Sequence, residues 1–109
     1  MPNYAEPGEH STFDTDTLVS TCIESGAGAL LLNAQVIPPT FFDLSTRVTG
    51  ELLHGLSKYS LRLAAVVPDL SSRSQSFQDF VRESNRGVQF RFFASREDAI
   101  AWLESMERR

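Results

Sequence analysis

Hydroxyl and carboxylate side chains gather in one short segment of this 109-residue chain. The segment follows two consecutive prolines, which disfavour helix before them, and precedes an apolar pattern of helical period. Ser, Thr and Asp at such a place cap helices. A hydroxyl there could also carry a phosphate, because a helix N-terminus stabilises negative charge. Two interpretations therefore stand, helix capping alone and a phosphoacceptor or partner-docking segment, for Thr40, Asp43, Ser45 and Thr46.

A second polar group follows an apolar run at positions 61–67 and precedes another helical pattern. Arginine beside a helix N-terminus can bind an anion together with the free backbone N–H groups. A solvated loop is the simpler alternative, since no glycine-rich phosphate cradle accompanies the group. The sequence predicts a ligand- or anion-binding edge, or such a loop, at Asp69, Ser71, Ser72 and Arg73.

The next helical pattern ends in a strongly polar stretch. Charged residues three or four positions apart lie on one exposed helix face and can pair there. Such a face can bind another protein, and the alternative is a helix end with solvated charges. The prediction is an interaction surface made of Arg82, Glu83, Asn85 and Arg86.

Few residues of the chain suit catalysis or metal binding. His10 and His54 are isolated, and no GxSxG, HExxH or CxxC motif is present. Asp43 and Asp69 could form an acid–base pair, yet nothing in the sequence indicates a substrate pocket between them. Cys22, the single cysteine, lies among apolar residues and is expected to be a buried thiol. We predict no catalytic residue, no metal and no cofactor.

The composition is that of one globular domain, with 41% apolar and 22% charged residues. A net charge of -4 argues against nucleic acid as a partner. No apolar run is long enough to span a bilayer, and the acidic first residues do not resemble a signal peptide. We therefore expect a cytoplasmic protein that binds neither nucleic acid nor membrane.

The hydrophobic pattern predicts at least three strands and four helices. Continuous apolar runs typical of buried strands cover residues 28–34 and 61–67, and a more alternating run over residues 88–94 predicts a strand closer to a sheet edge. Helical patterns cover residues 15–25, residues 44–58 and the segments after Ser74 or Ser76 and after Ser95. Helices between successive strands require parallel pairing. The predicted fold class is α/β, a small parallel sheet with helices on both faces, as a single domain over residues 14–109 after a loose N-terminal arm over residues 1–13.

This predicted sheet determines where the polar groups lie. The carboxyl ends of parallel strands meet at one edge, so the first two polar groups are expected there together. A three-stranded sheet either gains a strand from residues 1–13 or leaves an edge open, and an open edge predicts self-association. Gly50 and Gly55 each cost ~1 kcal/mol inside a helix, which predicts that something packs closely against both.

A family resemblance is carried by two segments, FFDLSTRVTGELLHGLSKYSLRLAAV and FQDFVRESNRGVQFRFF. They resemble the bacterial domain of unknown function 4180 family, whose pattern is Phe-Phe-Asp-Leu-x-Thr-Gly-x-Ala-Gly-Glu, a Tyr before the next strand, and Asp-Phe-x-x-Glu-Ser-Asn-x-Gly. The chain departs from this pattern at Arg47, Thr49, His54 and Gly55. The matching residues are Phe41, Phe42, Asp43, Leu44, Thr46, Gly50, Glu51, Tyr59, Asp79, Phe80, Glu83, Ser84, Asn85 and Gly87.

The resemblance implies an order of strands and helices similar to the STAS fold, which is an analogy at the level of the fold alone. In STAS antagonists a phosphorylatable Ser or Thr begins the helix after the strand corresponding to residues 28–34, which matches the neighbourhood of Thr40, Ser45 and Thr46. Members of the family usually begin with two further strands, so the chain resembles a member shortened at the N-terminus. The family has no assigned activity to carry over.

The combined prediction is a non-catalytic protein-interaction or regulatory module that resembles STAS antagonists. Its expected partners are another protein and, as a homo-oligomer, a second copy paired through an open sheet edge. The alternative is a sensor that binds a small ligand or nucleotide at the carboxyl edge of the sheet. An enzyme of unrecognised type comes third.

Overall fold

The computed structural model describes residues 3–8 and 13–107. In this part of the chain four strands alternate with four α-helices: β1 (Tyr4–Ala5), α1 (Thr15–Ser25), β2 (Ala29–Leu32), α2 (Val48–Lys58), β3 (Arg62–Val66), α3 (Gln75–Ser84), β4 (Phe90–Phe93) and α4 (Arg96–Glu107). All three strand pairings are parallel. The predicted α/β class with a parallel sheet is confirmed.

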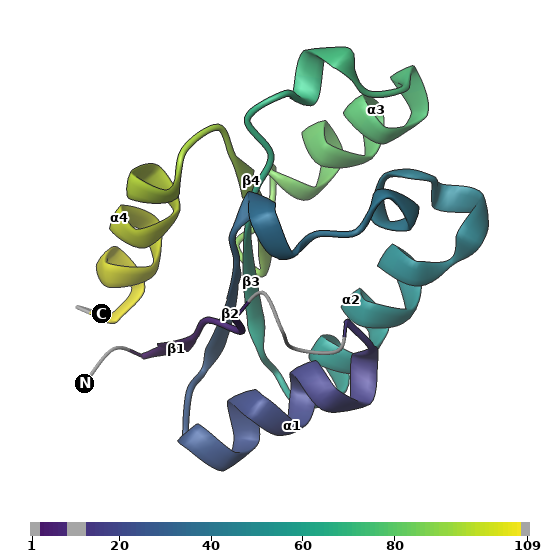
Figure 1. The fold of residues 1–109 in the computed structure, drawn as a ribbon. Coiled ribbons are helices and arrows are strands. Elements are labelled where there is room, and N and C mark those ends of the chain that lie inside the picture. The colour runs from purple at the N-terminus through teal and green to yellow at the C-terminus, as the bar shows by residue number, and fades with distance from the viewer. Residues whose placement is uncertain (1–2, 9–12, 108–109) are drawn as a thin grey trace.

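The strands lie in the sheet in their order along the chain, β1-β2-β3-β4. Right-handed crossovers that all advance in one direction place their helices on one face. Figure 1 shows this arrangement: α1, α2 and α3 cover one face of the sheet, and α4 alone covers the other. Because the strand order never reverses among the described strands, this part of the sheet lacks the switch-point crevice that binds ligands in doubly wound folds.

Two apolar clusters fill the space on either side of the sheet. The larger lies under α1, α2 and α3 and includes Phe41 and Phe77, both fully buried. The smaller lies under α4 and includes Trp102 and Leu103. All four residues of β2 are buried because its two faces belong to different clusters, which explains the continuous apolar run in the sequence.

The segment predicted as a loose arm contains a strand. Tyr4 and Ala5 pair with Ala29 and Leu30 of β2, so residues 1–13 do supply a further strand, one of the two alternatives left open by the sequence. A strand of two residues is too short to show the alternating apolar pattern from which strands are predicted. Glu6, just after β1, accepts two hydrogen bonds from Arg96, of 3.0 and 2.6 Å, and these raise the pKa of Arg96. Residues 1–2 and 9–12 lie outside the described residues.

The second predicted helix begins later than expected. We predicted residues 44–58, but α2 starts at Val48, after two 3-10 turns over Pro39–Phe42 and Leu44–Thr46. Arg47 separates the second turn from α2 with φ of 67°, in the left-handed region. A residue in that conformation cannot continue a right-handed helix, so the turn and α2 are separate elements.

Candidate functional site

The segment before α2 forms a tight polar turn. The Asp43 carboxylate accepts hydrogen bonds from the backbone N–H of Ser45 at 3.0 Å and from the Ser45 hydroxyl at 2.6 Å. The bond from the hydroxyl, then the bond from the backbone, lowers the pKa of Asp43. Asp43 therefore caps the 3-10 turn that follows it, and Ser45 donates to it.

Thr46 holds the same turn from inside. Its hydroxyl donates to the carbonyl oxygens of Thr40 at 2.8 Å and Asp43 at 2.7 Å, and it accepts from the N–H of Val48 at 3.4 Å. The four predicted residues thus come together, and their contacts are those of a cap. The phosphate hypothesis assumed a helix starting at Leu44, whereas a phosphate on Ser45 would lie beside the Asp43 carboxylate.

The loop after β3 approaches this turn through one arginine. The Arg73 guanidinium donates to the Asp69 carboxylate at 2.7 Å and lies over the Phe42 ring, with Cζ 3.6 Å from the ring centroid. Ser72 donates to the Asp69 carbonyl at 2.7 Å, and Ser71 contributes only its carbonyl, which accepts from Gln78 at 3.4 Å. The second polar group therefore reaches the segment of the first through the contact of Arg73 with Phe42.

A small hollow of about 150 Å³ lies between the carboxyl ends of β2 and β3. Its walls are mainly apolar, from Ile37, Phe42 and Val67, with Asp69 and Arg73 at one side. Arg73 Nε is buried and has no hydrogen-bond partner among the described residues. The polar side of the hollow is thus one guanidinium paired with one carboxylate.

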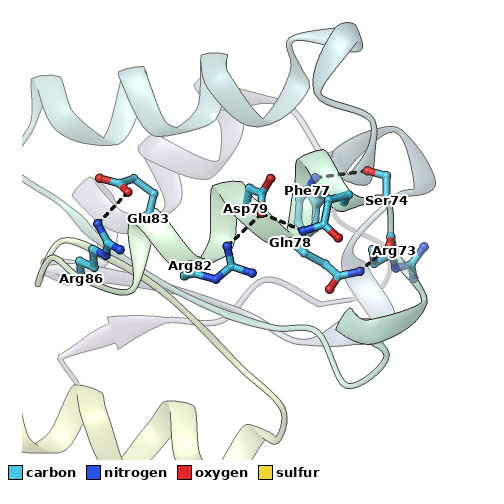
Figure 2. A network of polar contacts seen from close by, with 9 residues as sticks. Arg73, Ser74, Phe77, Gln78, Asp79, Arg82, Glu83 and Arg86 are labelled. Atoms are coloured by element: carbon cyan, nitrogen blue, oxygen red, sulfur yellow. Dashed lines mark hydrogen bonds and ion pairs between the residues drawn. The ribbon is translucent and has the colours of Figure 1, made fainter.

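The third predicted surface is divided in the structure. Figure 2 shows Asp79 paired with Arg82 at 3.0 Å and Glu83 paired with Arg86 at 3.4 Å on the outside of α3. All four side chains are more than half exposed, and such pairs contribute about 0–1 kcal/mol. Asn85 faces a different way and bonds the backbone of β4. The three charged residues therefore lie on the outside of α3, whereas the Asn85 carboxamide is bonded to β4.

Helix α2 has a close contact with α1 at Gly55. A Cβ atom at Gly55 would overlap Cγ2 of Thr15, so the predicted close packing is confirmed there. Outside this contact lies the α1–α2 groove, about 270 Å³, with charged and polar residues such as Asp16 and Lys58 in its lining. At its end Ile23 and Tyr59 are more than half exposed.

On its other side α2 faces α3 across a wider gap. For Gly50 the prediction of close packing is wrong, because no neighbouring heavy atom lies within 4 Å of where its Cβ would be. The space, about 400 Å³, is called here the α2–α3 groove, and it is lined by Leu44, Arg47, Gly50, Glu51, His54 and Phe80. The glycine is visible in the sequence and the groove is not, because glycine is the same residue whether a neighbouring group fills the space beside it or leaves it open.

Other chemistry is sparse in the described part of the chain. The Cys22 thiol is buried, lies 3.6 Å from the Ala29 carbonyl, and has its pKa raised to about 11 by burial. It stays protonated near neutral pH and is a poor nucleophile. Among the described residues no three His, Cys, Asp or Glu side chains gather as a metal site would require. No helix there has the length and apolar character to cross a membrane.

These features define a small parallel α/β domain with a polar, internally hydrogen-bonded carboxyl edge and an open groove beside α2. Residues 8–103 match the family described as a domain of unknown function, DUF4180, and the chain belongs to that family. Searches among curated proteins and among solved structures gave no match.

Proposed function

We propose that the domain is a non-catalytic protein-interaction module whose partner docks in the α2–α3 groove. The observation that carries the proposal is Gly50, a helix-weakening residue with open space where its side chain would be. Its cost to the helix is not offset by packing within the described chain. A partner group that approaches the α2 backbone at this position would offset it.

The lining of the groove supports this role. Leu44 and Phe80 provide half-buried apolar walls, whereas Arg47, Glu51 and His54 are exposed at its margin. An apolar centre with a polar rim is the usual anatomy of a protein interface, and a few central contacts supply most of the affinity. The analogy with STAS antagonists, which rests on element order alone, agrees with a regulatory role.

The test compares two variants of α2 in the native host. Gly50→Phe fills the groove, and Ser57→Phe places the same side chain at an exposed α2 position outside the groove lining. A specific partner should co-purify with the wild-type chain and with Ser57→Phe, and should be lost from Gly50→Phe. Circular dichroism checks that both variants fold. A set of co-purifying proteins that Gly50→Phe leaves unchanged counts against the groove.

A second candidate function is a small-ligand sensor at the hollow beside Arg73. It is favoured by the buried, unpartnered Nε of Arg73 and by the nearby Asp69 carboxylate. A thermal-shift screen tests it, because a ligand at 100 times its Kd adds about 2.7 kcal/mol of stability. A true ligand should lose its effect in Arg73→Lys, which keeps the charge and removes the Nε–H group.

We also propose that copies of the chain associate through a sheet edge. β1 and β4 are the outer strands of the described sheet, and β4, with four residues, offers the longer edge. Sedimentation velocity over a concentration series tests this part, and a monomer at high micromolar concentration removes it. The free thiol of Cys22 fits a reducing compartment, which supports the proposed cytoplasmic location.

A further inference from the structure

The outer side of β4 has backbone groups available for pairing. The carbonyls of Gln89 and Phe93 accept hydrogen bonds from the N–H groups of Leu63 in β3 and of Val67 just after it, at 2.9 and 2.8 Å, so these two residues face the sheet. Backbone groups alternate in direction along a strand, so Phe90 and Phe92 face outward. We call the outward N–H and C=O groups of these two residues the β4 edge.

Half of the β4 edge is occupied by a side chain. Asn85, at the end of α3, accepts from the N–H of Phe92 through Oδ1 at 2.8 Å and donates to the carbonyl of Phe92 through Nδ2 at 3.3 Å. A carboxamide carries the same donor and acceptor as a peptide group. Asn85 therefore binds the edge as one peptide group of a neighbouring strand would.

We propose that Asn85 holds the place of a strand from a second copy, and that the β4 edge pairs with β4 of that copy when the Asn85 side chain is displaced. This inference rests on the proposed self-association and names its surface and its control. Natural proteins block exposed edges in this way to limit pairing between chains. The occupant is a second copy because two identical edges form a closed twofold contact.

The register that pairs every outward residue of both copies is the one expected for this contact. In an antiparallel pair, two opposite residues that exchange both hydrogen bonds alternate with pairs that exchange none. Phe90 of one copy then lies opposite Phe92 of the other, and Arg91 lies on the twofold axis. Two opposed arginines repel each other, so Arg91 weakens the pairing in addition to Asn85. In the single chain Arg91 donates to the Gly87 carbonyl at 2.8 Å.

The test begins with Asn85→Ala and, as its control, Arg82→Ala, which removes a side chain whose hydrogen-bond partner among the described residues is Asp79 on the same helix. Two lost hydrogen bonds are expected to accelerate amide exchange at Phe92 about tenfold in dilute solution and to strengthen dimerisation about tenfold. Arg82→Ala should change neither. Unchanged exchange at Phe92, or an Asn85→Ala protein that stays monomeric at high micromolar concentration, overturns the proposal.

A cysteine variant tests the register independently. Arg91→Cys in the Asn85→Ala background places two thiols across the twofold axis, where opposed residues are close enough for a disulfide. Mild oxidation should give a covalent dimer, and Ser57→Cys in the same background should not. Equal crosslinking of both variants would mean that the contact lies elsewhere. A wild-type chain that stays monomeric while Asn85→Ala dimerises removes the proposed self-association of the wild-type chain and leaves the inference about the β4 edge in place.

Discussion

Helix α2 carries one glycine on each side, and the surroundings of the two glycines differ. On the α1 side Gly55 is buried, and a Cβ there would overlap Thr15. On the α3 side Gly50 is exposed, and the space of its missing side chain is open. Both glycines weaken the helix by about the same amount, roughly 1 kcal/mol against alanine. Only at Gly55 does a neighbour within the described chain make use of the missing side chain.

This difference separates a packing device from a surface feature. Gly55 lets α1 and α2 approach, and that approach buries Val19 and Leu56 in the larger cluster. Gly50 brings no such contact and leaves the α2–α3 groove deeper. Substitutions at the two positions should therefore change stability in opposite directions, which makes the comparison measurable.

The largest effect is expected from Gly55→Ala. The added methyl group must displace Thr15 or separate α1 from α2, and overpacking of this kind costs about 2 kcal/mol of unfolding free energy. Urea denaturation measures the change. Thr15→Ser removes the clashing Cγ2 and should restore most of the loss in the double variant. If Gly55→Ala left stability unchanged, the contact between α1 and α2 would be loose, and Gly55 would not differ from Gly50 in its packing role.

A somewhat smaller loss is expected from Thr49→Val. Thr49 is fully buried on α2 and its hydroxyl donates to the Phe41 carbonyl, which ties the preceding turn to the helix. Valine keeps the shape and leaves that buried carbonyl without its partner, at a cost of about 1–1.5 kcal/mol. Thr49→Ser, which keeps the hydroxyl, is the matched variant. Equal losses from both would assign the effect to packing rather than to the hydrogen bond.

Elements with a long apolar pattern could be predicted from the sequence. The helix predicted over residues 15–25 is α1 with the same bounds, because Asp14 caps it and Gly26, with φ of 72°, ends it. The strand predicted over residues 28–34 contains β2. The strand at 88–94, more alternating than the others, contains β4 at an edge of the sheet. In these cases the apolar pattern and the capping residues lie within the element itself, so its position could be predicted without knowledge of its neighbours.

Features that depend on distant neighbours could not be predicted. The left-handed backbone of Arg47, the direction of the Asn85 side chain and the stacking of Arg73 on Phe42 each depend on a partner in another element or turn. The polar residues before α2 and after β3 were noticed in the sequence, and the structure adds that Arg73 of the second group lies over Phe42 in the segment of the first. Capping and a phosphoacceptor role could not be separated, since hydroxyl groups that cap turns look the same in a sequence as hydroxyl groups that react.

A gain in stability is expected from Gly50→Ala. Gly50 lies in helical backbone with open space at the Cβ position, so alanine adds helix propensity without a clash, worth about 0.5–1 kcal/mol. Thermal unfolding measures the gain, with Gly55→Ala as the variant of opposite sign. Stabilisation together with weaker partner binding would show that Gly50 is kept for function. A loss of stability would mean that the groove closes on Gly50 in solution.

The smallest expected effect on stability comes from two capping aspartates. Asp14 caps α1, and Asp43 caps the 3-10 turn that precedes α2. Hydrogen bonds from Thr17 and from Ser45 lower their respective pKa values below the ordinary 3.8. A lowered pKa in the folded state means that each carboxylate adds stability that is complete above the unfolded-state pKa and is lost as the pH falls through the folded-state value. Stability should therefore decline in that acidic window, and Asp14→Asn and Asp43→Asn should each flatten the decline.

NMR titration of Ser45→Ala separates the two sites, because the pKa of Asp43 should rise towards 3.8 while that of Asp14 stays where it is. If both values moved, the caps would be coupled through α2, and the two sides of the helix would not be independent.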